Sequence, residues 1–164
     1  MPLQAGPLAS FVFPMDEPDK HGTIDVDVDS FPIVMVTQWG AVSDEVYAAH
    51  LEEMGRLEER IRVLDRRDFG DKMVMVYDAS HASPPTARQR KMQAEFIAAN
   101  EDRIQGATLG FAFVAPSVGL RGVIQAIFWL QPPLYDYRIC SNLLEAYNWA
   151  DDKLEEYKHA RGAA

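Results

Sequence analysis

The sequence predicts an α/β domain built on a mixed, mostly parallel sheet of about five strands with four helices. Apolar runs typical of strands alternate along the chain with helical patterns, which is the order expected of a parallel sheet. The first two strand patterns are separated only by a turn at Ser30, which predicts an antiparallel hairpin and therefore a mixed sheet. The 164 residues, of which 48% are hydrophobic and 25% charged, suffice for one folded domain.

The N-terminal half of the chain predicts an arm, a hairpin and a helix. Residues 1–22 contain four prolines, so we expect an irregular arm ahead of a single domain over residues 23–160. The run "TIDVDVD" at 23–29 alternates apolar and acidic residues, as a half-buried strand does, and "FPIVMVTQW" at 31–39 reads as a more buried strand. Ser43 is placed to cap a helix. Apolar residues spaced by three, four and three predict that this helix is one continuous amphipathic element: Met54, Leu57, Ile61 and Leu64.

The C-terminal half predicts three further strands and three helices. We expect strands over 72–78, 107–115 and 135–140, with a turn leading from the first of them into a helix over 85–100. A short helix capped by Ser117 should end before Pro132, and Asn142 should cap the last helix together with Glu145. The expected core residues of the first and last of these helices are Met92, Phe96 and Ile97, and Leu144, Tyr147, Leu154 and Tyr157.

Charge and cysteine content narrow the function classes. The formal net charge of −9 argues against a nucleic-acid binder and against attraction to an anionic membrane. Cys140 is the single cysteine, so no intrachain disulfide forms, as is typical of a reducing cytoplasm. We see no signal peptide and no run of the roughly 18 apolar residues that a membrane span needs. We therefore expect a cytoplasmic protein.

No catalytic or metal-binding constellation stands out in the sequence. Asp78, Ser80 and His81 have the residue types of a hydrolase triad, but residues so close in sequence rarely align in one line of hydrogen bonds. Asp78 and Ser80 are better explained as turn residues that bind backbone amides. The histidines have no ligand spacing, since His50 and Glu53 alone are a weak signal. We predict no catalytic residue, no metal and no cofactor.

A polar cluster precedes and opens the predicted helix over 85–100. Basic residues at a helix start are mildly unfavourable, by about 0.3–1 kcal/mol each, so their presence in an acidic chain calls for a reason. One reason is a bound anion or a negatively charged partner, which the free amides of a helix start also attract. The other is pairing with nearby acids, such as Lys91 with Glu95. The candidate residues are Ser80, Ser83, Thr86, Arg88, Arg90 and Lys91.

The second candidate site is the segment "VIQAIFWLQPPLY" at 123–135, which lacks the polar stripe of a surface helix. Its apolar residues cannot all face the sheet of so small a domain. Three interpretations stay open: contact with a second copy or a partner, cover by the N-terminal arm, or the lining of an apolar pocket. The candidate residues are Val123, Ile127, Phe128, Trp129, Leu130, Pro132 and Tyr135.

The order of elements and four sequence blocks resemble the bacterial SpoIIAA-like domains of STAS/SEC14 type. The blocks are "VYDAS", "GFAFVAPS", "FWLQPP" and "LLEAYNWA", and the resemblance covers about residues 22–157. It implies a mixed sheet backed by helices. The better-known STAS members are anti-sigma-factor antagonists, which are not enzymes and release a partner when a serine at a helix start is phosphorylated. That element would fall here on Thr86 to Gln89, where alanine takes the place of the serine. Thr86, Ser83 and Ser80 are the hydroxyls left to substitute, and none matches the motif.

We therefore expect a non-enzymatic regulatory or protein-interaction domain of signalling type that forms a homodimer and binds a protein partner. Residues 123–135 would supply the apolar contact and the helix start a polar one. The SEC14 side of the resemblance implies an alternative, in which the same apolar segment holds a small apolar ligand or lipid.

Overall fold

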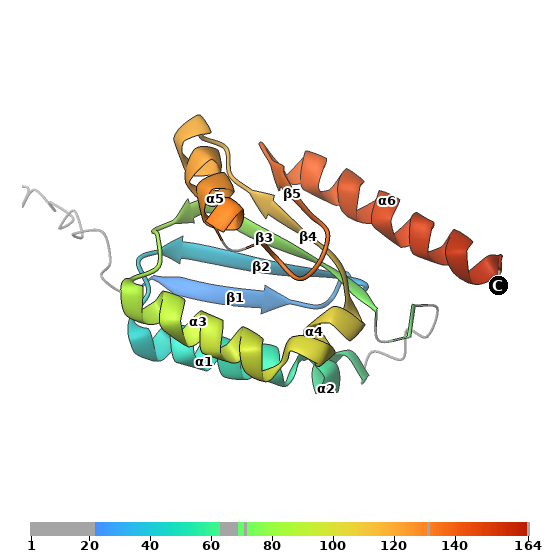
Figure 1. The fold of residues 1–164 in the computed structure, drawn as a ribbon, viewed down its shortest axis with the longest axis horizontal. Coiled ribbons are helices and arrows are strands. Elements are labelled where there is room, and N and C mark those ends of the chain that lie inside the picture. The colour runs from blue at the N-terminus through green and yellow to red at the C-terminus, as the bar shows by residue number, and fades with distance from the viewer. Residues whose placement is uncertain (1–21, 63–68, 71, 131, 164) are drawn as a thin grey trace, which may run out of the picture.

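The computed structural model describes residues 22–62, 69–70, 72–130 and 132–163, and the predicted arm over residues 1–22 lies almost wholly outside this part. One five-stranded sheet has the order β1-β2-β3-β4-β5 (Figure 1). The strands are β1 (Thr23–Asp27), β2 (Ile33–Gly40), β3 (Met73–Ala82), β4 (Thr108–Val114) and β5 (Tyr137–Cys140). β1 and β2 pair antiparallel and every other neighbouring pair is parallel, so the predicted mixed, mostly parallel sheet is confirmed.

Six helices connect or follow the strands in the described part of the chain. They are α1 (Asp44–Gly55), α2 (Leu57–Arg62), α3 (Ala87–Ala99), α4 (Glu101–Ala107), α5 (Val118–Leu130) and α6 (Leu143–Gly162). In Figure 1, α1 to α4 lie together beside β1, whereas α5 and α6 lie at the β4–β5 end of the sheet.

The two faces of the sheet bury separate apolar clusters. Val26, Val34 and Val36 pack with Leu57 and Ile61 of α2 on one face, which we call the α1 face. On the opposite face, called the α6 face, Val74, Val76 and Val114 pack against α6. The alternation of apolar and polar residues in the strands sets these faces, because successive side chains point to opposite sides.

The predicted inner face of the last helix is partly wrong. Leu154 is buried as predicted and Tyr147 and Tyr157 are half-buried, but Leu144 is 71% exposed, and Ala146 and Ala150 are buried where no core residue was predicted. These small alanines let the helix approach the sheet closely. A Cβ at Gly110 of β4 would lie 2.6 Å from the Trp149 ring, so that position has no room for a side chain.

The helix count differs from the expected four for two reasons. The first predicted helix is broken at Arg56, whose backbone (φ −100°, ψ 5°) separates α1 from α2, next to the poor helix former Gly55. Leu64 of its predicted stripe lies outside the described residues. The seven-residue α4 was not predicted, because so short a helix shows barely two turns of periodicity.

Met92 and Phe96 of α3 are half-buried against Tyr47 and Leu51 of α1 rather than against the sheet, and Ile97 is half-buried too.

Candidate functional site

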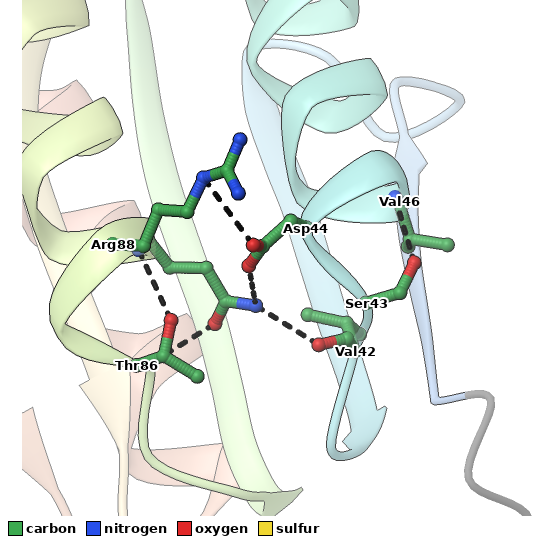
Figure 2. Close-up of polar contacts among 7 residues, drawn as sticks. Val42, Ser43, Asp44, Val46, Thr86 and Arg88 are labelled. Atoms are coloured by element: carbon green, nitrogen blue, oxygen red, sulfur yellow. Dashed lines mark hydrogen bonds and ion pairs between the residues drawn. The ribbon is translucent and has the colours of Figure 1, made fainter.

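The start of α3 is held by a complete capping box (Figure 2). The backbone N–H of Gln89 donates to the Thr86 hydroxyl at 3.1 Å, and the backbone N–H of Thr86 donates to the Gln89 side chain at 3.1 Å. The same Gln89 amide is 2% exposed and also donates to the Val42 carbonyl at 2.9 Å and the Asp44 carboxylate at 3.1 Å. Gln89 therefore joins the starts of α1 and α3.

The three predicted cations at this helix start all have partners within the chain. Arg88 Nε lies 3.4 Å from the Asp44 carboxylate, and Arg90 donates to the Pro85 carbonyl at 2.8 Å. Lys91 lies 3.8 Å from Glu95, as the acid-pairing interpretation expected. The side chains of Arg88 and Lys91 are each 77% exposed, so these ion pairs are solvated and weak. An anion site here stays a prediction, and any anion would compete with these partners.

The predicted turn after Asp78 is wrong, because β3 continues through Ala82. Asp78 does accept a hydrogen bond from the backbone N–H of Ser80 at 2.9 Å, as expected of this residue pair. The backbone of Ser83 is bonded on both sides: its N–H donates to the Gly40 carbonyl and its carbonyl accepts from the Gln38 side chain. Gln38 is itself buried, with 4% of its surface exposed, so the end of β3 is fixed to the end of β2.

The α5 helix exposes much of its apolar surface. Trp129 is 88% exposed, Val123 50% and Ile127 42%. Within α5 the one charged residue is Arg121, and its guanidinium donates back to the carbonyls of Ala115 and Pro116. The cap predicted for this helix is confirmed, since the Leu120 N–H donates to the Ser117 hydroxyl at 3.1 Å. Among the described side chains of α5, the exposed ones are therefore uncharged and, apart from Gln125, apolar.

The other candidate residues of segment 123–135 divide between the side of α5 that faces the sheet and the side that faces solvent. Phe128 faces the sheet, with its ring centroid 4.9 Å from that of Phe113 and 4.7 Å from that of Tyr137. Tyr135 stacks on Phe111 at 5.5 Å, and burial raises its pKa to about 12. Pro132 is exposed, and the Leu130 side chain lies outside the described part. The aromatic rings thus fill much of the space between α5 and the sheet.

An exposed ring pair lies at the ends of β2 and β3, and the sequence analysis did not single out its Trp39 and considered its His81 only as a member of a triad. Trp39 is 53% exposed and stacks on His81, with ring centroids 4.1 Å apart and the planes inclined by 4°. A signal was present, because the alternation of β2 places Trp39 on the same side as Thr37 and opposite the buried Val36 and Gln38. The pairing with His81 depends on a register between distant strands, which the sequence does not give.

Within the described residues, no cluster of three or more histidine, cysteine or acidic side chains is arranged to hold a metal ion. In the same residues no helix combines the length and apolarity needed to cross a membrane. A surface groove of about 420 Å³ lies between α1 and α3, with Leu51, Met92 and Phe96 in its lining. Burial lowers the pKa of His50 on α1 to about 4, so this imidazole is neutral near neutral pH.

The fold is similar to the crystal structure of an uncharacterized protein from the DUF3478 family with a SpoIIAA-like fold, from Shewanella loihica. The similarity has a TM-score of 0.52, covers 79% of this chain and 93% of that one, and comes with 11% sequence identity. No family model and no curated protein matches the chain. The SpoIIAA-like, STAS-type fold expected from the sequence is confirmed, and at this identity the likeness concerns the fold alone.

Proposed function

We propose that this chain is a non-enzymatic protein-interaction domain that associates through the outer face of α5. The observation that carries the proposal is the exposure of Trp129, Val123 and Ile127 on a helix surface without charge. Burying one large aromatic side chain removes about 150–250 Å² from water, which stabilises a complex by about 4–6 kcal/mol before the costs of association. An apolar helix face of this kind is typical of a contact surface.

The same surface favours a second copy of the chain as the partner. A twofold symmetric contact places each patch against its own copy, so a charge close to the twofold axis meets its own like charge. A chain with a net charge of −9 needs an uncharged patch for such a contact, and the outer face of α5 provides one. The cluster at the start of α3 lies outside this surface, and an acidic partner or a phosphate would bind there in competition with the present partners of Arg88, Arg90 and Lys91.

Sedimentation velocity of the native chain and of two matched variants tests this proposal. Trp129→Glu should convert a dimer into a monomer, because a carboxylate buried in an apolar interface is strongly unfavourable. Leu144→Glu makes a similar change at another exposed apolar helix position, 71% exposed on α6, and should leave the dimer intact. Equal sedimentation of all three proteins, with the fold retained, would refute the contact face.

The alternative is a carrier of a small apolar ligand or lipid. The rings of Phe113, Phe128 and Tyr135 remain half-buried beside α5, and a ligand could complete their burial. A carrier purified from cells should hold cargo, which native mass spectrometry detects as added mass on the chain. An interaction domain should appear as bare chains.

A further inference from the structure

The α6 face of the sheet is covered unevenly. The buried cluster on this face joins α6 to residues of β3, β4 and β5, whereas β1 and the end of β2 lie beyond it. Asp25 and Asp27 are exposed on this face, Thr37 is half-buried, and Trp39 is 53% exposed. Tryptophan is enriched at protein contact surfaces, so an indole this exposed beside acidic side chains makes this face a candidate contact surface.

Strand register brings the polar groups of this face together. Asp25 of β1 lies opposite Thr37 of β2, and Thr37 in turn lies opposite Asp78 of β3. Beyond Thr37 the register between β2 and β3 shifts by one residue, so Trp39 lies opposite His81, and the stacking of the two rings places both on this face. Side chains directly opposite in the antiparallel β1–β2 pair are about 4.5–5.5 Å apart at Cβ, and the parallel neighbours β2 and β3 lie about 4.7–4.9 Å apart, so two carboxylates flank a hydroxyl beside a half-exposed indole. We call these five residues the acidic sheet face: Asp25, Thr37, Trp39, Asp78 and His81.

The electrostatic field at this face is negative. The pKa of Tyr147, which packs on this side from α6, is raised by burial and further by the charges of Asp27 and Asp78. In the described part of the chain neither Asp25 nor Asp78 forms an ion pair, and the Asp78 carboxylate accepts a hydrogen bond from the Ser80 N–H. The carboxylates are therefore available to a cationic group from outside.

We propose that the acidic sheet face binds an arginine-bearing segment of a partner protein. A guanidinium is planar, stacks on an indole, and donates paired hydrogen bonds to carboxylates, so it matches the two aspartates and the face of the Trp39 ring that is not stacked on His81. Lysine offers a point charge without this planar fit. The inference deepens the proposed function, since it rests on the domain acting through protein contacts, but it uses a surface separate from α5.

Fluorescence anisotropy with a fluorescein-labelled Gly-Arg-Gly-Arg-Gly peptide tests the proposal on the full chain. The matched peptide with citrulline in place of arginine keeps the shape and loses the charge, and should not bind. Asp25→Asn with Asp78→Asn should weaken binding by about tenfold, since each exposed ion pair contributes about two- to fivefold. Asp102→Asn is the control, because it removes one negative charge on α4, whose Ala107 packs on the α1 face of the sheet. It should leave the affinity for the arginine peptide within about a factor of 1.5, as expected of a surface charge away from the contact.

The aromatic part of the site has its own variants. Trp39→Ala should weaken the arginine peptide by about fivefold, and Trp39→Phe by less, because a smaller ring keeps part of the cation–π contact. Equal binding of the citrulline peptide, or equal weakening by Asp102→Asn, would overturn the proposal. So would a change of oligomeric mass in Trp39→Ala, which would make this face a contact between copies. Trp129→Glu reports on the α5 dimer and should leave peptide binding unchanged, so the two proposals fail separately.

Discussion

His50 makes the stability of the fold depend on pH, with lower stability at acidic pH. The imidazole lies partly buried on α1, its Nδ1 atom has no hydrogen-bond partner in the described part of the chain, and the Tyr47 ring packs edge-on at 6.3 Å. Burial lowers its pKa from 6.5 to about 4. The unfolded chain therefore binds a proton that the folded chain excludes, and the stability that His50 supplies is full above pH 6.5 and is lost as the pH falls toward 4.

The size of the effect follows from the two pKa values. At pH 5 the unfolded imidazole is almost fully protonated, whereas the folded one is about nine-tenths neutral, so linkage predicts a loss of about 2 kcal/mol between pH 7 and pH 5. Carboxyl groups whose pKa is lowered affect stability at lower pH than His50 does. Glu145, which accepts hydrogen bonds from the Ser141 N–H and hydroxyl, is an example. Its contribution to stability is lost only as the pH falls below about 4.5.

Urea unfolding at pH 7 and pH 5 measures this loss, with His50→Gln and His50→Leu as variants that cannot take up the proton. The native chain should lose about 2 kcal/mol and both variants less than about 0.5 kcal/mol over the same pH range. A loss in the native chain no larger than in the variants would show that proton uptake by His50 does not destabilise the fold, as would a His50 titration near 6.5 by NMR.

Three further predictions concern the packing of α6 and the start of α3. Gly110→Ala should destabilise the domain by about 1–3 kcal/mol in thermal or urea unfolding, since its Cβ would strike the Trp149 ring, and a fully stable variant would contradict that contact. Thr86→Ala removes the cap of α3 and should cost about 1 kcal/mol in urea unfolding, whereas Thr86→Ser should cost little. Calorimetry with inorganic phosphate should detect weak binding that is lost when Arg88 and Arg90 are both replaced by alanine with the fold unchanged. The same heat of binding from the native chain and the double variant would contradict an anion site here.

Much of the sheet could be predicted because strand signals are local. Alternation in residues 23–29 and the continuous apolar run beginning at Lys72 each specify a strand without reference to the rest of the chain. The caps at Ser43, Ser117 and Asn142 were predicted from side chains that bond within the next three residues. Such capping hydrogen bonds can be predicted because both partners are close in sequence.

What sequence reasoning missed depends on contacts between distant segments. Leu144 has the spacing of a core residue, but the close approach of α6 at Ala146 and Ala150 turns that position outward. The extension of β3 past Asp78 is stabilised by pairing with Trp39 and Gly40 of β2, which overrides the turn tendency of the polar residues. The partner of Arg88 is Asp44, on another helix, whereas the Lys91–Glu95 pair within one helix was foreseen.

Native mass spectrometry of the purified full chain decides whether α5 is a contact surface between copies. We expect a dimer of two bare chains, which the Trp129→Glu substitution converts into a monomer. A chain that carries a few hundred daltons of added mass, or a monomer at every concentration, would contradict it.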